Sequence, residues 1–227
     1  MHIPGYLINT VTVLMGSGLG LLIGPRLPEN IKRIMLSGLG LSTLIIGAQM
    51  ALDTRKLLLM VGSLVLGGII GQIIGIEEWL ERVGEKLKSR VRSSSNTFVL
   101  GFVTASLLFC TGPMTVVGSM EDGLSGTADL IYMKSIMDGA AAIALTASLG
   151  IGVIFSSLTV LIFQGILTYL GMAMGDFISQ KVLTEISAVG GILILGIGLN
   201  LLSVSRIRVG NFLPALLIAA LLAWWIL

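Results

Sequence analysis

Long apolar stretches recur along almost the whole chain, and they limit its possible folds more than any other feature. A helix that spans a bilayer needs about 20 mostly apolar residues. Strands are excluded because the stretches are long and continuous, and because lipid-exposed backbone must pair within a helix or a closed barrel. The sequence therefore predicts an all-α, polytopic transmembrane bundle in a single domain of residues 1–227. Eight spans are expected, at residues 7–23, 34–52, 57–76, 97–120, 130–155, 158–177, 186–204 and 212–227.

The charge content excludes the common soluble classes of protein. Only 11% of the residues are charged, whereas soluble domains carry about 25%. A soluble globule of this size could not cover its surface with so few polar groups. The formal net charge is only +2 and the basic residues form no continuous face, so nucleic acid is not an expected partner. The expected partner is the lipid bilayer.

Catalytic and metal-binding motifs are missing from the sequence. The single cysteine, Cys110, cannot form an intrachain disulfide, and the single histidine, His2, leaves no His-based metal site. The sequence has no P-loop, no HExxH and no Gly-x-Ser-x-Gly. Residues 1–6 lack the basic region of a signal peptide, so the first apolar stretch is expected to be a retained span. We expect no enzyme activity, no cofactor and no metal.

Residues 77–96 are the one stretch that breaks the apolar pattern. Apolar residues recur there at helical spacing, and the second half is basic. This pattern predicts an interfacial amphipathic helix on the cytoplasmic leaflet, or alternatively a solvated linker helix. The positive-inside rule then places this segment and the basic loop after the first span in the cytoplasm, and the N-terminus outside. The numbers of basic residues on the cytoplasmic and the outer side are the same for eight spans and for seven spans plus a re-entrant fourth segment. Both topologies therefore remain open.

A weak internal repeat relates the two ends of the chain. Residues 7–76 would form one repeat and residues 158–227 the other, on either side of a central broken-helix pair at 97–155. With eight crossings the two repeats run in opposite directions, which is the inverted topology of many secondary transporters. The first matched positions are Val13, Leu14, Gly18 and Gly24 with Val160, Leu161, Gly165 and Gly171. After a four-residue adjustment, Gly40, Gly47, Gln49 and Arg55 match Gly191, Gly198, Asn200 and Arg206.

The fourth apolar segment is interrupted about halfway along its length. Pro113 lacks an N–H group and its ring clashes with the carbonyl four residues earlier, and Gly112 weakens the helix further. A break at this depth is tolerated where the freed backbone groups line a cavity or face protein. Transporters use such discontinuous helices to present helix ends to ions and substrates. An ordinary proline kink is the structural alternative.

Ionisable and amide side chains surround this break. Asp122 follows it, and Lys134 and Asp138 lie one helical turn apart early in the fifth segment. Such groups in or near a span are costly unless they are paired or hydrated, so they are functional candidates. An interfacial salt bridge with ordinary helix-to-helix hydrogen bonds is the alternative. The predicted substrate or ion pathway consists of Cys110, Thr111, Gly112, Pro113, Met114, Asp122, Lys134, Asp138, Gln164 and Asn200.

The centre of the sequence carries the motifs Phe109-Cys110-x-Gly112-Pro113-Met114, Gly118-Ser119, Asp122-Gly123-Leu124-x-Gly126, Lys134-Ser135 and Asp138-Gly139. These motifs resemble those of an uncharacterised family of bacterial inner-membrane proteins, typified by YqgA and YdfK. The similarity covers the whole chain and implies a bacterial plasma-membrane location and a role in transport. That family has no established substrate, so the resemblance implies no particular chemistry.

Two functional hypotheses follow from these patterns. The first is a small secondary transporter or channel for a small polar or ionic solute, with its site at the broken helix. Because 227 residues offer few walls for a pathway, we expect a homodimer. The second hypothesis is a membrane scaffold or sensor whose central charges only stabilise packing. A hydrated pocket that reaches Pro113 and Asp138 would favour transport, and a dry, packed centre would favour the scaffold.

Overall fold

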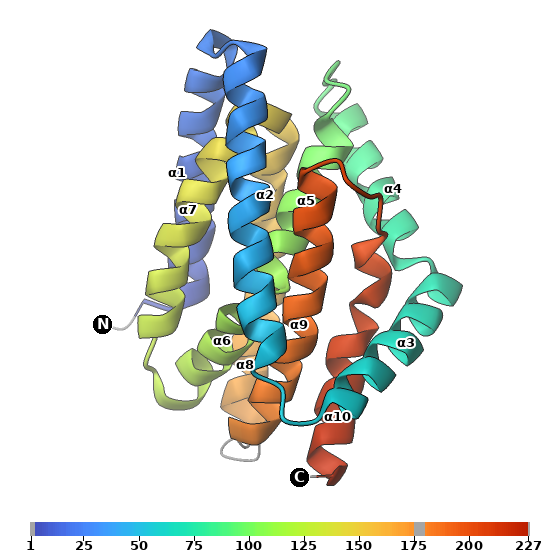
Figure 1. Cartoon of the computed structure of the whole chain (residues 1–227). Coiled ribbons are helices and arrows are strands. Elements are labelled where there is room, and N and C mark those ends of the chain that lie inside the picture. Colours follow the sequence, from blue (N-terminus) through green and yellow to red (C-terminus); the bar gives the residue numbers. More distant parts are fainter. Residues whose placement is uncertain (1–2, 175–179, 227) are drawn as a thin grey trace.

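The chain is a bundle of membrane-spanning α-helices (Figure 1). A computed structural model describes residues 3–174 and 180–226, and within these residues it contains no strand. Seven of the described helical stretches are long and apolar enough to cross a membrane, and α5 with α6 makes an eighth if the two count as one bent span. The predicted class is therefore confirmed. The helices are α1 (Gly5–Ile23), α2 (Glu29–Leu52), α3 (Leu57–Ile74), α4 (Ile76–Arg90), α5 (Phe98–Cys110), α6 (Pro113–Ser125), α7 (Asp129–Leu149), α8 (Ser156–Met174), α9 (Gln180–Leu201) and α10 (Pro214–Ile226).

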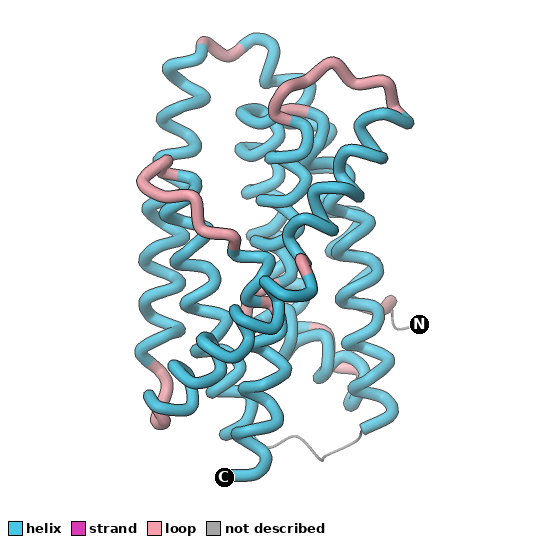
Figure 2. Tube along the Cα trace, turned by 90° about the vertical axis from the view of Figure 1, so that its right-hand side faces the viewer, coloured by secondary structure: helices cyan, strands magenta, loops and turns pink. Residues whose placement is uncertain are grey.

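Helices α5 and α6 together run the whole length of the neighbouring helix α7. A Cβ added at Gly101 of α5 would lie 3.2 Å from Leu149 Cβ, at the end of α7. A Cβ added at Gly118 of α6 would lie 3.0 Å from Leu130 Cβ, at the start of α7. The two helices are bent by 56° where they meet. This course along α7 is the one expected if the fourth segment is a single bent span. The described ends of the chain lie toward the same end of the bundle (Figures 1 and 2).

The predicted fifth segment, 130–155, is divided in two. Helix α7 ends at Leu149 because Gly150 has a φ of 84°, a conformation that glycine adopts without strain. A short 3-10 helix, η2 (Ile151–Phe155), then leads into α8. The ends predicted at residues 177 and 227, and His2, lie outside the described residues.

Glycine allows α1 and α7 to pack in parallel with their backbones almost touching. Cβ atoms added at Gly16, Gly20 and Gly24 would lie 2.4–2.8 Å from carbonyl oxygens of α7. Real Cβ atoms do not approach so closely, so only glycine fits at these positions. Such close contact provides the van der Waals packing that holds helices together in lipid.

Helices α2 and α9 pack antiparallel through two reciprocal glycine contacts. A Cβ added at Gly47 would lie 2.7 Å from Gly191 O, and one added at Gly40 would lie 3.3 Å from Gly198 O. In the predicted repeat, Gly40 corresponds to Gly191 and Gly47 to Gly198. Each contact is therefore the repeat equivalent of the other, as a two-fold relation between the repeats requires. Superposition of the repeats stays a prediction.

The amphipathic segment forms α4, which ends at Arg90 rather than at residue 96. It runs along α5 toward the end of the bundle where α1 joins α2, instead of lying across that end (Figures 1 and 2). Leu80 and Gly84 are buried, and a Cβ added at Gly84 would lie 3.1 Å from the Phe102 ring. Asn211 also accepts a hydrogen bond from the Glu77 N–H group (2.8 Å) and so caps the start of α4. These contacts explain why α4 follows the side of the bundle.

Candidate functional site

Four polar side chains form a buried cluster between α1, α7 and α8. Asp138 forms an ion pair with Lys134 and accepts a hydrogen bond from Asn9 Nδ2 (2.9 Å). Asn9 Nδ2 also donates to Gln164 Oε1 (3.2 Å). Asn9 and Gln164 are completely buried, and Lys134 and Asp138 are 5% and 7% exposed. We call these four residues the central cluster.

The local geometry of three helices brings the central cluster together. Lys134 and Asp138 are separated by one turn of α7 and so lie on the same face. The glycine contacts hold α1 against α7, which places Asn9 beside Asp138. A desolvated ion pair is tolerated only when additional hydrogen bonds satisfy the charged groups, and Asn9 provides one of them. The cluster is a buried, electrically neutral polar site.

Two amide atoms of the central cluster have no hydrogen-bond partner among the described residues. They are Asn9 Oδ1, an acceptor, and Gln164 Nε2, a donor. A buried polar group without a partner costs about 1–3 kcal/mol, and folded proteins rarely leave one unexplained. The cluster therefore presents one acceptor and one donor to a ligand or a water molecule.

The helix break lies directly beside the central cluster. Helix α5 ends at Cys110 and α6 begins at Pro113. A Cβ added at Gly112 would lie 3.9 Å from Lys134 Cε, so the lysine side chain passes next to the break. Lys134 Nζ also lies 6.0 Å from the centre of the Phe109 ring. A cation near the C-terminal end of α5 is favourable because the helix dipole is negative there.

Thr115 satisfies a carbonyl group that the break would otherwise leave free, because Pro113 has no N–H group to donate to Phe109 O. Thr111 instead adds a second donor to Leu107 O, which already accepts a hydrogen bond from Thr111 N (2.9 Å). The Thr111 hydroxyl donates to Leu107 O (2.7 Å) and the Thr115 hydroxyl donates to Phe109 O (2.8 Å). Cys110, Thr111 and Gly112 are buried, whereas Met114 is partly buried. The break is thus buried within the bundle, and side-chain hydroxyl groups already hydrogen-bond part of its backbone.

Two of the predicted pathway residues lie elsewhere and have structural partners. Asp122 is buried and accepts a hydrogen bond from Gly5 N (2.8 Å), so it caps the start of α1. It follows Pro113 by nine residues, which places it about 13 Å farther along α6. Asn200 lies on α9, beside a separate cavity. The structure therefore groups only Lys134, Asp138 and Gln164 of the predicted charged and amide residues.

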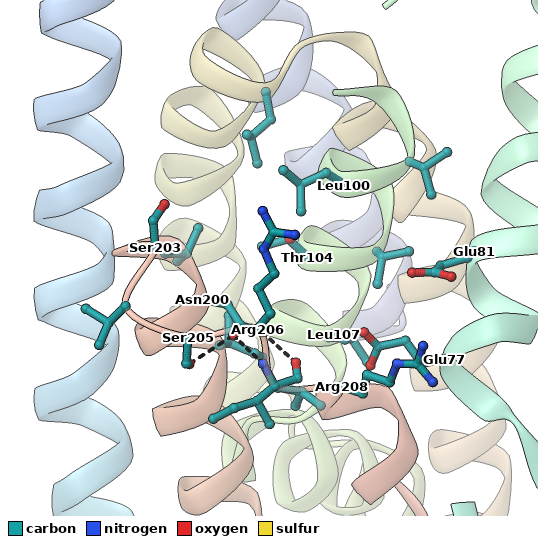
Figure 3. Close-up of a pocket in the computed structure, with 18 of the residues that line it drawn as sticks. Glu77, Glu81, Leu100, Thr104, Leu107, Asn200, Ser203, Ser205, Arg206 and Arg208 are labelled. Atoms are coloured by element: carbon teal, nitrogen blue, oxygen red, sulfur yellow. Dashed lines mark hydrogen bonds between the residues drawn. The ribbon is translucent and has the colours of Figure 1, made fainter. Parts of the chain in front are cut away.

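The cavity beside Asn200 has a volume of about 890 Å³. It lies between α2, α4, α5 and α9, and residues 202–208 fold back to form one wall (Figure 3). Asn200 holds this loop, since its Nδ2 donates to Ile207 O (2.7 Å) and its Oδ1 accepts from Ile207 N (2.8 Å). Both ends of the Asn200 amide are used, so its role is to shape the cavity. We call this space the loop cavity.

Charged side chains of both signs line the loop cavity. Arg208 forms an ion pair with Glu78. Glu77 accepts a hydrogen bond from Gly210 N (2.7 Å). Burial raises the pKa of the Glu77 carboxyl, and the Gly210 N–H group partly offsets this rise. Arg206 and Glu81 also line the cavity, and neither forms an ion pair or hydrogen bond within the described part of the chain.

One apolar layer separates the loop cavity from the central cluster. Leu107 and Ile197 line the cavity on the side of the helix break and are 5% and 3% exposed. The next turn beyond Leu107 carries Thr111, and Ile194 on α9 would lie 4.0 Å from a Cβ added at Gly112. The loop cavity itself does not reach Pro113 or Asp138, because Leu107 and Ile197 close it on that side.

Sequence reasoning missed Asn9 and Glu185. Asn9 is the only amide in the first apolar stretch, and that isolation was a usable signal. Glu185 on α9 is buried, and its carboxylate accepts hydrogen bonds from the Thr54 hydroxyl and from Arg55 N. It anchors the loop between α2 and α3, so its role is structural.

Comparisons with known proteins agree with the resemblance inferred from the central motifs. The model of a family described as "protein of unknown function (DUF554)" matches residues 4–224. The uncharacterized protein YqgA of Escherichia coli (strain K12) is 34% identical over 220 residues, covering 95% of this chain and 94% of its own. The uncharacterized membrane protein YdfK of Bacillus subtilis (strain 168) is 30% identical over 218 residues, covering 94% and 93%. No solved structure matches.

Proposed function

Since this chain belongs to the DUF554 family, whose function is unknown, we propose an activity from its geometry: it is a small secondary transporter or channel for a small polar or ionic solute. One observation carries the proposal. A buried ion pair with an unused amide donor and an unused amide acceptor lies beside a broken membrane helix. Intramembrane charges of this kind mark substrate and ion pathways.

The loop cavity supplies the access route in this proposal. It would admit the solute from the cytoplasm, and the layer of Leu107 and Ile197 would act as a closed apolar gate. Movement of this layer would expose the central cluster, where Lys134 and Asp138 exchange their mutual contact for contacts with the solute. The reciprocal glycine contacts of α2 and α9 support the inverted repeat on which alternating access depends.

We place the protein in the bacterial inner membrane with its N-terminus outside. The relatives YqgA and YdfK come from bacteria, and YdfK is named as a membrane protein. The basic residues of α4 and of the loop after α1 support a cytoplasmic position for that end of the bundle.

A homodimer fits the outer face of α2. A Cβ added at Gly38 would meet no atom within 4 Å, and Ser42 and Gln49 are exposed. These three residues follow the spacing of one helix face, with intervals of four and seven. A small residue and two polar groups on a lipid-facing surface favour packing against another helix.

A membrane scaffold is the second candidate. The close glycine packing and the apolar layer between the loop cavity and the central cluster favour it, since they leave the centre closed. The two functions differ in one requirement. A transporter needs the layer of Leu107 and Ile197 to open, whereas a scaffold does not.

Flux into vesicles reconstituted with the full chain tests the proposal. We expect uptake of at least one member of a panel of inorganic ions, amino acids and sugars, and its loss in Asp138→Asn, which keeps the shape and removes the charge. Asp129→Asn, on the same helix but exposed, should keep full activity. No uptake above that of empty vesicles for the whole panel would favour the scaffold.

A cysteine-accessibility assay tests the gate without knowledge of the solute. A cysteine at Thr111 should react slowly with a water-soluble maleimide, because the residue is only 1% exposed. Leu107→Ala should increase this rate by removing part of the apolar layer, whereas Leu36→Ala, in the cavity wall, should not. Equal rates in the two variants would contradict the assignment of the gate.

A further inference from the structure

The loop cavity contains a basic and an acidic side chain that have no partner in the protein. Arg206 extends from the folded-back loop toward Thr104 and Leu100 of α5, and Glu81 extends from α4 (Figure 3). Neither forms an ion pair or hydrogen bond within residues 3–174 and 180–226. Arg208, in contrast, is neutralised by Glu78. Two opposite charges on different walls of one cavity are left available.

We infer that the loop cavity binds a zwitterion, with its carboxylate or phosphate on Arg206 and its ammonium group on Glu81. An arginine guanidinium suits a carboxylate or phosphate because it donates two parallel hydrogen bonds. The ammonium group has three donors, and a carboxylate is a pure acceptor. The cavity volume of about 890 Å³ lies within the range of about 300–1,000 Å³ found for ligand pockets.

The neighbouring charges favour a zwitterion over a simple ion. Glu77 and Glu81 lie one turn apart on α4, and the charge of Glu81 contributes to the raised pKa of Glu77. An ammonium group between them would relieve this repulsion, whereas an anion alone would increase it. A cation alone would leave the charge of Arg206 unpaired. The cavity therefore offers complementary contacts only to a ligand with both charges.

The central cluster has the same balance of charges. Lys134 and Asp138 are one cation and one anion, as are Arg206 and Glu81, so both the central cluster and the loop cavity offer one charge of each sign to a ligand. This inference thus rests on the proposed function and names its substrate class. The alternative source of the same chemistry is a phospholipid headgroup, since Leu100 and Val204 add exposed apolar surface to the cavity wall.

Direct binding to the full chain in detergent tests the inference without any flux. The probes are glycine, β-alanine, γ-aminobutyrate and 5-aminovalerate, in which the two charges are progressively farther apart. Propionate and propylammonium each carry one of the charges. We expect at least one zwitterion to bind, measured by calorimetry or by a rise in Tm, and each single-charge probe to bind roughly tenfold or more weakly, because one charged hydrogen bond is lost.

Variants locate the binding site. Arg206→Gln and Glu81→Gln should each weaken the binding of the zwitterion roughly tenfold or more. Arg55→Gln, the repeat equivalent of Arg206, and Glu85→Gln, one turn beyond Glu81, are matched controls because both residues are exposed and neither lines the cavity. Both controls should bind as the unmodified chain does. Equal effects of control and cavity variants would overturn the assignment.

A second arm of the experiment separates the two ligand sources. The chain is placed in nanodiscs of phosphatidylethanolamine or of phosphatidylglycerol, and its Tm is compared. A higher Tm in phosphatidylethanolamine nanodiscs that is lost in Arg206→Gln and Glu81→Gln, without binding of the free probes, identifies a lipid headgroup as the ligand. Binding of the free probes identifies a solute. No binding in either arm, or equal binding of the single-charge probes, overturns the inference. Uptake of an ion or a sugar in the flux assay would then still support the transport proposal.

Discussion

Removal of the Asp138 carboxylate should destabilise the protein strongly. Asp138→Ala deletes the counter-ion of Lys134, which is 5% exposed, and an acceptor for Asn9 Nδ2. Breaking a buried pair by removing one partner typically costs about 3–5 kcal/mol. For a chain of this length each kcal/mol lowers Tm by about 2–4 °C, so we expect a fall on the order of 10 °C.

Replacement of both charged residues should restore most of this stability. Lys134→Met combined with Asp138→Leu leaves no uncompensated charge, and such apolar replacement of a buried pair is often close to neutral. Asn9 Nδ2 also keeps its bond to Gln164 Oε1, so the double variant does not isolate the amide.

Thermal unfolding of the purified variants in one detergent measures both effects. Asp129→Ala, at the exposed start of α7, is the control and should leave Tm nearly unchanged. A loss of less than about 1 kcal/mol for Asp138→Ala would match an exposed salt bridge and would refute the description of a desolvated pair. Failure of the double variant to regain stability would refute the electrostatic explanation of the loss. A stable double variant that no longer transports would separate the functional role of the pair from packing.

Three further predictions concern orientation, packing and the loop. A cysteine at Ser94, in a Cys110→Ala background, should react with an impermeant maleimide only from the cytoplasmic side; labelling from outside would reverse the orientation. Gly71→Ala should cost about 1–3 kcal/mol or more, because the added Cβ would clash with the carbonyl oxygen of Asn211. Gly62→Ala, which faces open space on the same helix, should be neutral or slightly stabilising, and similar Tm values for the two variants would contradict the packing of α3. Asn200→Ala should speed hydrogen exchange at residues 202–208, because the loop loses both bonds to the amide, and unchanged exchange would show that other contacts hold the loop.

Local features of the sequence predicted the helices and the break. Apolar length sets where a helix can span the membrane, and this depends on neighbouring residues alone. Gly112 and Pro113 ended α5 and started α6 for a similarly local reason, since proline cannot donate the backbone hydrogen bond that a continuous helix needs. The pairing of Lys134 with Asp138 also follows from local spacing, because residues four apart share one face of a helix.

Contacts between distant segments were outside the reach of sequence patterns. Asn9 and Asp138 are 129 residues apart, and they meet only because glycines let α1 lie against α7. Asn200 was predicted in the pathway from its residue type, yet its amide holds a loop whose fold no spacing rule describes. The division at Gly150 was missed because the apolar pattern continues through the turn.

The sequence by itself determined a polytopic helical membrane protein with a broken central span, because burial in lipid and helix termination are decided over a few residues. The tertiary structure alone decided that Lys134, Asp138, Asn9 and Gln164 share one buried site. It also decided that a loop cavity with unpaired charges lies above that site, behind one apolar layer. Packing of helices in lipid depends on the match of whole surfaces, and a one-dimensional pattern does not specify which surfaces meet.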